Sequence, residues 1–278
     1  MAAVTIVIVS YNTRPELENC LASLARHPPR TPHDVIVVDN ASTDGTPEAL
    51  RQRWPAVRLL EAGSNLGFAG ANNLGVRAST SEFVLLLNSD TLVPDAAVDT
   101  LVAHLVAEPG AGAAGPRIID AAGRPELSFG AMMGPCTELR QKLLVRLQAR
   151  GVPAVVRHVE RLTRRRHDAD WVSGACLLVR REDAMAAGLL DERYFLYAED
   201  VDFCAALRGL GRRILFTPDA QVVHLRGASG RSRPAATERA YRESQLAFYA
   251  KHHPRWVPVL RVYLRLRGKL PAAASDRA

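Results

Sequence analysis

The sequence lacks a long hydrophobic run. No stretch of its 278 residues approaches the roughly 18 to 20 consecutive apolar residues that a membrane-spanning helix needs. Its first residues, MAAVTIVIVSYN, also lack the basic start and the cleavage site of a secretory signal. They therefore predict the first strand of a cytoplasmic protein.

Cysteine and aromatic residues are also scarce. The four cysteines, Cys20, Cys136, Cys176 and Cys204, are far apart and form no Cys-x-x-Cys pair, so neither a disulfide framework nor a zinc site is indicated. Aromatic residues make up 6% of the chain and are not interleaved with basic residues as in RNP-type proteins. An RNA-binding module therefore rests on positive charge alone.

The positive charge is unevenly distributed. The chain carries a net charge of +7, but residues 226–278 alone carry +9, which leaves −2 for residues 1–225. A second basic cluster lies at Arg161 and 164–166. Both clusters fit docking to an anionic surface, either a membrane or a lipid diphosphate, and both equally fit solvated helix faces.

Strand-like and helix-like segments alternate in the first half of the chain. Strands are predicted at residues 4–12, 35–38, 57–60, 84–87 and about 113–119, with helices between them. Thr13 and Thr46 are expected to cap two of the helices. Such alternation predicts an α/β fold, with a Rossmann-like, mostly parallel sheet covered by helices on both faces.

The second half is less regular. We expect a helical insertion at about 132–169, a strand within DWVSGACLLVRRED, and two short strands within RILFTPDAQVVHLRG. This gives a domain at 1–230 and a basic helical tail at 231–278. In the tail, RWVPVLRVYLRLRGKL sets aromatic and aliphatic residues among arginines. It is either an amphipathic helix lying on an anionic membrane or a helix packed back on the domain.

Two predicted strands end on an aspartate. The run VLLLNSD is apolar to Leu87 and then polar at Asn88, Ser89 and Asp90, and the strand at 35–38 is followed by Asp39. Ligands of open parallel sheets bind beyond the carboxyl ends of the strands. If both strands are parallel, Asp39 and Asp90 face one crevice; otherwise both residues only begin turns. One carboxylate suffices for Mg²⁺ or Mn²⁺ when a substrate diphosphate supplies most other ligands.

Three further segments combine candidate groups. NLGFAGANNLG offers a close backbone approach and amide hydrogen bonds, or only tight helix packing. In FLYAEDVDF, Glu199 and Asp200 meet a helix start, where acids serve either as a general base or as partners of the helix dipole. His224 ends a strand before a Gly/Ser/Arg loop. It is either a metal ligand, with the loop as a lid over phosphates, or a structural histidine.

Taken together, these segments resemble glycosyltransferase family 2, in the bacterial branch that includes rhamnosyltransferases. The matching segments run in family order to about residue 230: VSYN, VVDNASTDG, NLGFAGANNLG, LLLNSD, WVSGACLLVRR, LDERYFLYAEDVDFCAALRGLG and VVHLRG. The resemblance implies a GT-A fold, in which a nucleotide-binding sheet is continuous with an acceptor-binding part.

The resemblance also implies roles for single residues. Asp200 matches the catalytic base, and Asp90 matches the metal-binding acid of the DxD motif, with His224 as a second metal ligand for Mg²⁺ or Mn²⁺. Asn88 stands where the family has the first acid of that motif, which is a departure. The expected donor-binding residues are Ser10, Tyr11, Asn12, Asp39, Asn65, Gly67, Asn72, Asn88, Ser89 and Arg226.

The implied function is inverting, metal-dependent hexosyl transfer in cell-envelope polysaccharide synthesis. A sugar would pass from a nucleotide-sugar donor, with dTDP-rhamnose the choice that the branch favours, to a hydroxyl of a saccharide or polyprenyl-diphosphate-linked acceptor. The expected place is the cytoplasm or the inner face of the membrane, with no nucleic acid partner. The alternative is a nucleotide-sugar binding protein without turnover, against which the presence of both Asp90 and Asp200 argues.

Overall fold

The computed structural model describes residues 3–225 and 234–271. A sheet of nine strands runs through this part of the chain. The strand order is β3-β2-β1-β4-β10-β6-β11-β5, and β8 pairs with β11. The strands are β1 (Val4–Ser10), β2 (His33–Asp39), β3 (Arg58–Glu61), β4 (Phe83–Asn88), β5 (Thr91–Leu92), β6 (Ala111–Ile119), β8 (His167–Ala169), β10 (Cys176–Arg180) and β11 (Arg213–His224).

The sheet is mostly parallel, as the alternation of segments predicted. Strands β3, β2, β1 and β4 run in one direction, and β11 runs parallel to β6. Strand β10 is antiparallel to both of its neighbours, and the short β5 and β8 are antiparallel to β11. The two strands expected in 213–227 form one strand, β11, because the chain continues past an irregularity between Thr217 and Gln221.

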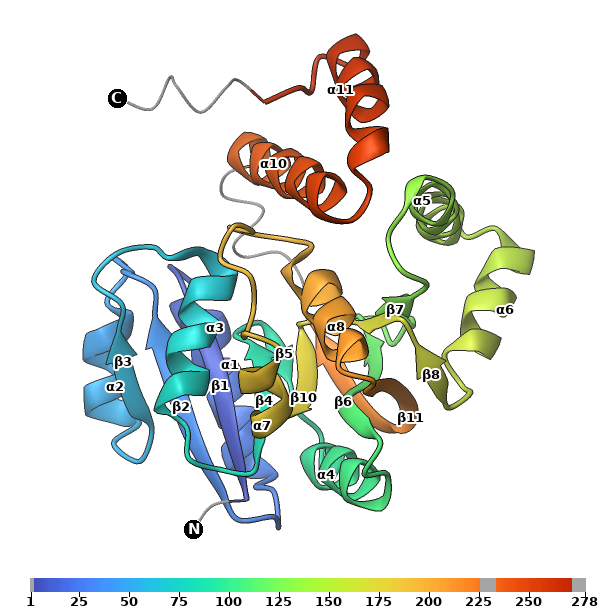
Figure 1. Ribbon diagram of the computed structural model, residues 1–278. Coiled ribbons are helices and arrows are strands. Elements are labelled where there is room, and N and C mark those ends of the chain that lie inside the picture. The colour runs from blue at the N-terminus through green and yellow to red at the C-terminus, as the bar shows by residue number, and fades with distance from the viewer. Residues whose placement is uncertain (1–2, 226–233, 272–278) are drawn as a thin grey trace.

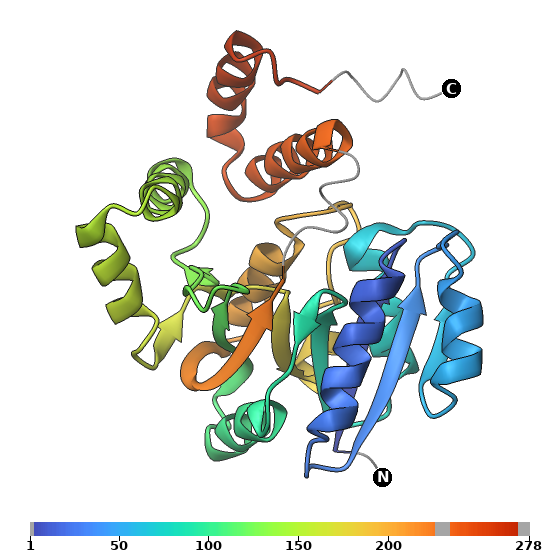
Figure 2. The ribbon, with the colours of Figure 1, turned by 180° about the vertical axis from the view of Figure 1, so that it is seen from behind.

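Helices cover both faces of the sheet (Figures 1 and 2). Alternate residues of the strands point to opposite faces, so each face buries its own apolar set. One core joins the strands to α1 (Arg14–Arg26), α2 (Thr46–Arg53) and α4 (Ala97–Ala107). The other joins them to α3 (Gly67–Ala78), α7 (Arg181–Ala186) and α8 (Glu199–Gly209).

The expected insertion forms two helices, α5 (Pro135–Ala149) and α6 (Pro153–Leu162), beside a small sheet of β7 (Phe129–Gly130) and β9 (Trp171–Val172). The tail forms α10 (Pro234–His252), a short 3₁₀ helix (Pro254–Trp256) and α11 (Val257–Leu266). In Figure 1 these helices lie at the end of the molecule toward which β1 and β2 run.

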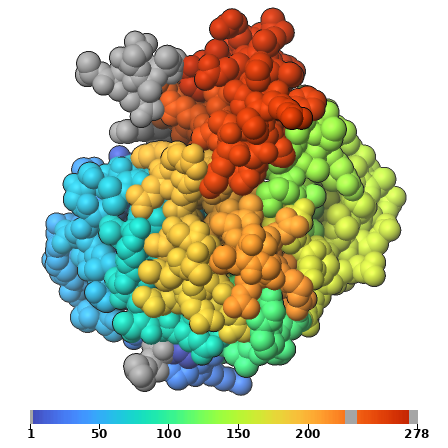
Figure 3. Space-filling model, in the orientation of Figure 1, coloured from blue at the N-terminus to red at the C-terminus, as the bar shows by residue number. Residues whose placement is uncertain are grey.

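The tail packs back on the domain through a third apolar core, whose buried members are Tyr194, Val201, Phe248, Tyr249, Leu260 and Leu264. Figure 3 shows the tail resting on the loop before α8 and touching the insertion. The opposite side of α11 is exposed. A helix packed on the domain and a helix that also contacts a membrane are therefore compatible interpretations of the tail. Among residues 3–225 and 234–271, no helix has the length and apolar character needed to cross a membrane.

We predict that Gly75→Ala destabilises the fold. Gly75 lies in α3 against β1, and a Cβ atom there would overlap the side chain of Val7, so the change overpacks the core. Overpacking costs about 1–3 kcal/mol of unfolding free energy, which urea denaturation would measure. Gly209→Ala in α8, where a Cβ meets open space, is the matched control and should be neutral or stabilising. Equal midpoints for both variants would contradict the prediction.

Candidate active site

The ends of β1 and β4 are joined by a chain of hydroxyl groups, and the end of β2 lies beside that of β1. In the sheet register Ser10 lies opposite Asp39, and the residue before Ser10 lies opposite Asn88. The hydroxyl of Thr13 lies 3.1 Å from that of Ser10 and 3.0 Å from that of Ser89. Thr13 was expected to cap α1 with its side chain, and this was wrong, because its hydroxyl makes these contacts instead. The carboxyl edge of the sheet is therefore fixed before any ligand binds.

Asp39 offers one unused oxygen at this edge. Its side chain is buried, and its Oδ2 accepts a hydrogen bond of 3.0 Å from the backbone N–H of Ser42. Its Oδ1 is also buried and has no hydrogen-bond partner among the described residues. Because a buried carboxylate oxygen without a donor is costly, this position suits an N–H or O–H group of a ligand.

The segment Tyr11–Asn12 borders Asp39 on the outside. The Oδ1 of Asn12 accepts a hydrogen bond of 2.7 Å from the N–H of Thr43, and the N–H of Asn12 donates to the hydroxyl of Ser42 at 3.0 Å. These bonds hold Asn12 at a φ of 53°. The two loops around Asp39 are thereby tied together, and Tyr11 stays partly exposed beside them.

Hydrogen bonds and close packing in the NLGFAGANNLG segment, residues 65–75, fix the start of α3. The Oδ1 of Asn65 accepts hydrogen bonds from the Asn40 side chain at 2.9 Å and from the N–H of Gly67 at 3.0 Å. Gly67 has a φ of 72°, and a Cβ there would overlap the carbonyl oxygen of Phe195. Asn72 is buried and donates to a carbonyl one turn earlier in α3. The structure thus gives these residues packing roles, and their contact with a donor stays a prediction.

Asp90 and His224 lie side by side. His224 ends β11 opposite Thr91 of β5, and Asp90 directly precedes that strand. The distance from His224 Nε2 to Asp90 Oδ1 is 3.2 Å, and that from its Nδ1 to Glu126 Oε2 is 3.5 Å. Burial alone would lower the pKa of His224, but hydrogen bonds to the two carboxylates and their charges raise the pKa to about 9.

This pair can hold a divalent cation only together with other ligands. Among residues 3–225 and 234–271, no three His, Cys, Asp or Glu side chains form a group that could bind a metal ion by themselves. A carboxylate oxygen is nevertheless a ligand that Mg²⁺ and Mn²⁺ prefer, and an imidazole nitrogen is a ligand of divalent transition metals. The donor set therefore fits a cation whose remaining ligands come from a bound substrate.

Asp200 lies in the first turn of α8, after two residues in the left-handed region, Tyr197 at φ 71° and Ala198 at φ 68°. Its Oδ2 accepts a hydrogen bond of 2.9 Å from the N–H of Gly174, and its Oδ1 accepts one of 2.8 Å from the N–H of Val201. Burial raises the pKa of Asp200, and these N–H groups oppose the rise. The carboxylate is fixed in orientation and poised to accept a proton.

Its neighbour Glu199 differs sharply. Glu199 is buried, and its Oε2 has no hydrogen-bond partner among the described residues. Burial, and then the charge of Asp200, raise the pKa of Glu199 well above its usual value. Glu199 is therefore the harder of the two to ionise.

A cavity of about 300 Å³ connects Asp200 with His224. It extends from the edge of the sheet to α5 and α10, so the insertion and the tail both form its wall. Its lining consists of Glu126, Leu127, Ser128, Ala131, Met133, Thr137, Glu138, Gln141, Lys142, Trp171, Ser173, Tyr197, Ala198, Asp200, Val201, His224, Tyr241 and Gln245.

Glu138 clasps α5 to α10 above this cavity. Its Oε1 accepts hydrogen bonds from Lys142 at 2.6 Å, from Gln245 at 2.6 Å and from the hydroxyl of Tyr241 at 3.1 Å. Its Oε2 accepts one of 2.8 Å from the hydroxyl of Tyr249. The insertion and the tail are thus joined by hydrogen bonds to a single carboxylate.

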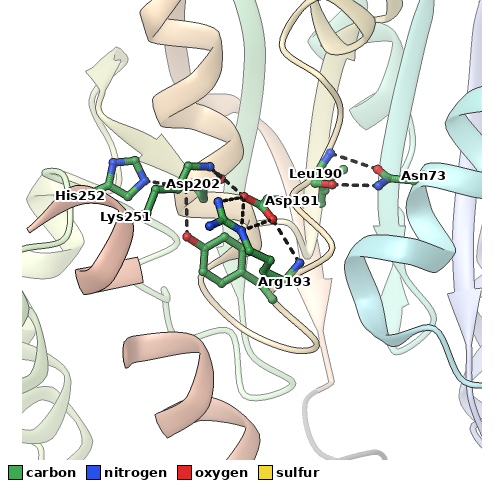
Figure 4. A network of polar contacts seen from close by, with 8 residues as sticks. Asn73, Leu190, Asp191, Arg193, Asp202, Lys251 and His252 are labelled. Atoms are coloured by element: carbon green, nitrogen blue, oxygen red, sulfur yellow. Dashed lines mark hydrogen bonds and ion pairs between the residues drawn. The ribbon is translucent and has the colours of Figure 1, made fainter. Parts of the chain in front are cut away.

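A second polar cluster fixes the other end of α10 (Figure 4). The buried carboxylate of Asp202 accepts hydrogen bonds from Lys251 at 2.8 Å and from Tyr194 at 3.2 Å, and it lies 2.5 Å from Nε2 of His252. Lys251 also bonds to Asp191 at 2.9 Å. Because Asp202 is in α8 with Asp200, α10 is registered directly against the helix that carries the candidate base.

The structure brings most of the predicted site residues to one edge of the sheet. Ser10, Asp39, Asn88, Ser89 and Asp90 end or follow adjacent strands, and Asp200 shares a cavity with His224. Arg226 and the predicted lid of 226–231 lie outside the described residues.

Sequence reasoning missed Glu126 and the cavity wall of Glu138, Lys142 and Gln245. No local signal marks these residues, because their place depends on how the insertion and the tail fold back.

Comparison with known proteins adds a family and a fold. Residues 5–182 match the family described as glycosyl transferase family 2. The chain is 36% identical over 288 residues to N-acetylglucosaminyl-diphospho-decaprenol L-rhamnosyltransferase of two strains of Mycobacterium tuberculosis, covering 98% of this chain and 94% of that protein.

Two solved structures share the fold at low sequence identity. A mannosyltransferase from Pyrobaculum calidifontis in complex with GDP-Man and Mn²⁺ has a TM-score of 0.60 at 22% identity, covering 95% of this chain and 69% of that chain. GalNAc-T7 with UDP, GalNAc and Mn²⁺ has a TM-score of 0.64 at 17% identity, covering 88% of this chain and 48% of that chain. The expected GT-A fold is confirmed.

We predict that Glu138→Ala loosens the wall of the cavity. The change leaves four donors without their shared acceptor, so the free energy of unfolding should fall by about 2 kcal/mol or more, since a hydrogen bond to a charged group contributes about 1.5–3 kcal/mol. Amide hydrogen exchange in α5 should accelerate more than exchange in β1. Glu182→Ala, an exposed helical position, is the control. Unchanged exchange in α5 would refute the clasp.

Proposed function

Because the chain belongs to glycosyltransferase family 2, we propose that it transfers rhamnose from dTDP-rhamnose to a hydroxyl of a lipid-linked saccharide in cell-envelope polysaccharide synthesis. The observation that carries this proposal is that Asp200 and His224 line one cavity, with Asp90 beside His224 and Asp39 on the same edge of the sheet. The acceptor class follows the name of the Mycobacterium tuberculosis relative.

The geometry around Asp39 favours a pyrimidine nucleotide as donor. One carboxylate oxygen is occupied by the N–H of Ser42, and only the other is left for a ligand. Thymine and uracil present one ring N–H, which matches one acceptor, whereas guanine presents two neighbouring donor groups. Ser10, Asn88 and Ser89 lie along the same edge, on the path that the ribose and the diphosphate would follow.

We assign Mg²⁺ or Mn²⁺ to Asp90 and His224. When bound, the cation would neutralise the charge that grows on the departing diphosphate. The contact between Glu126 and the second ring nitrogen of His224 fits a positioning role, because carboxylates commonly orient a metal-binding imidazole in this way.

The reaction proposed is a single displacement with inversion. The acceptor oxygen attacks the anomeric carbon, the bond from that carbon to the diphosphate oxygen breaks, and Asp200 accepts the hydroxyl proton. The two backbone N–H groups on Asp200 fix the direction of its carboxylate, and its raised pKa makes it a better proton acceptor.

The cavity suits a sugar acceptor. Its volume of about 300 Å³ is at the small end of ligand pockets, which fits one sugar unit rather than a long chain. Trp171 and Tyr197 supply flat apolar surface, and Gln141 and Ser173 supply polar groups. An acceptor bound here would present a hydroxyl directly to Asp200.

We propose that residues 1–230 form the catalytic domain and that residues 231–278 form a tail that holds the enzyme at the inner face of the membrane. The tail helix α11 buries Leu260 and Leu264 against the domain, while Tyr263 of the helix and Trp256 just before it are exposed. Its arginines suit anionic headgroups. A peripheral contact of this kind would bring the cavity to a polyprenyl-diphosphate acceptor.

We predict that Asp200→Asn lowers turnover about 10²–10⁴-fold, because the general base is lost. Donor affinity should change little, since Asp200 faces the acceptor. The measurement is nucleoside diphosphate release over a panel of sugar nucleotides, with donor titration in parallel. Asp34→Asn, an exposed position at the opposite edge of the sheet, is the control. Equal release by Asp200→Asn and wild type would favour a nucleotide-sugar binding protein without turnover.

A chelator should abolish release, and Mn²⁺ or Mg²⁺ should restore it. His224→Ala removes a proposed ligand and should raise the metal concentration required for half-maximal rate. Glu126→Gln should raise it about 10–100-fold, the usual effect of losing a partner of a metal-bound histidine. Glu182→Gln should leave it unchanged. Full activity of the wild type in excess chelator would rule out the cation.

A further inference from the structure

Helix α5 is unusually exposed for a helix of a folded domain. None of its fifteen residues is buried. Helices in proteins gain most of their stability by packing an apolar face, but Leu139 and Leu143 of α5 are 70% and 53% exposed. They lie one turn apart, so they form one outward stripe, which Cys136 extends at the start of the helix.

The other side of α5 faces inward. Thr137, Glu138, Gln141 and Lys142 line the cavity, and Glu138 clasps α10. The helix therefore separates the acceptor cavity from an exposed apolar stripe. A partner on that stripe would lie directly outside the cavity wall.

Helix α11 repeats this arrangement. Leu260 and Leu264 are buried against α10, while Val262 and Leu266 point away from the domain and are 57% and 83% exposed. Trp256, Val259 and Tyr263 are exposed with them. In Figures 1 and 3, α5 and α11 lie at the same end of the molecule, with α10 next to both.

Charge identifies the partner. Residues 135–166 carry nine Lys or Arg against two acids, a net +7, and residues 234–271 carry eight against two, a net +6. The whole chain carries +7, so the remainder carries −6. Apolar stripes flanked by arginines on two neighbouring elements match an anionic lipid surface. A second copy of the chain would bring like charges together.

We propose that the outward faces of α5 and α11 dock together on an anionic lipid bilayer, with Leu139 and Leu143 as a contact independent of the tail. This rests on the proposed function in one respect, the lipid-linked acceptor. Docking through α5 places the cavity wall at the headgroup layer, where the diphosphate of such an acceptor lies. The insertion thus orients the enzyme, and the tail alone does not.

The test is sedimentation of the full-length protein with phosphatidylcholine vesicles, with and without phosphatidylglycerol. Leu139→Ser with Leu143→Ser should weaken partitioning to the anionic vesicles roughly tenfold, because two large apolar side chains no longer enter the interface. Val262→Ser with Leu266→Ser should weaken it similarly. Val106→Ser is the matched control, because Val106 is 58% exposed in α4 and α4 lies away from α5 and α11 in Figure 1.

The outcomes separate this proposal from the proposed function. Partitioning by the α5 variant equal to that of wild type overturns the α5 contact, and an equal loss with Val106→Ser overturns its specificity. A wild-type dimer that the α5 variant dissociates would assign the stripe to a second copy instead.

Turnover on a detergent-soluble, short-chain acceptor should stay at the wild-type level in the α5 variant. Absence of that turnover in wild type would refute the function while leaving vesicle binding intact.

Discussion

The antiparallel strand β10 is the constraint on which the site depends. Strands β1, β2 and β4 end at one edge of the sheet, and β10 begins there because it runs the other way. The two residues before β10 contribute backbone groups to the site. The carbonyl of Ala175 accepts a hydrogen bond of 3.0 Å from the N–H of Asn88, and the N–H of Gly174 donates one to the carboxylate of Asp200. One short segment thereby joins the strand that precedes Asp90 to the candidate base.

The acidic groups of the site have separate environments. Asp39 has one satisfied oxygen and one unused buried oxygen, Asp90 is paired with His224, and both oxygens of Asp200 accept backbone N–H groups. Glu199 is buried beside Asp200, and the pKa values of both are raised. Because burial and hydrogen-bond partners differ at each position, the carboxylates can differ in chemistry. Asp39 can accept a hydrogen bond from a ligand, Asp90 can bind a cation, and Asp200 can accept a proton.

The wall of the cavity is held differently from the carboxyl edge of the sheet. The edge that carries Asp39 rests on a continuous sheet with apolar cores on both faces, whereas α5 meets α10 through the carboxylate of Glu138. Polar clasps on half-exposed helices open at lower free energy than a sheet core does. The cavity wall is therefore expected to open more readily than the sheet edge that holds Asp39 and Asp90.

The sequence alone predicted β1, β2, β3, β4 and β6 to within a few residues and the helices of the insertion, because periodicity is a local signal. It placed Asp39 and Asp90 at one edge only on the condition that their strands are parallel, which the sheet confirms. It also predicted Asp200 and His224 through their resemblance to a family. Only the tertiary structure decided that Glu126 meets His224 and that Thr13 bridges two strand ends, since neither contact follows from neighbouring residues.

The same limit applies to the helices. The composition of the tail left a helix on an anionic membrane and a helix packed back on the domain as alternatives. The fold packs one side of α11 on the domain and leaves the other side exposed. The sequence predicted a helical insertion without indicating which of its faces would be buried, and the position of α5 leaves the stripe of Leu139 and Leu143 exposed. Periodicity determines which residues share a face, but the direction of that face depends on contacts between distant segments.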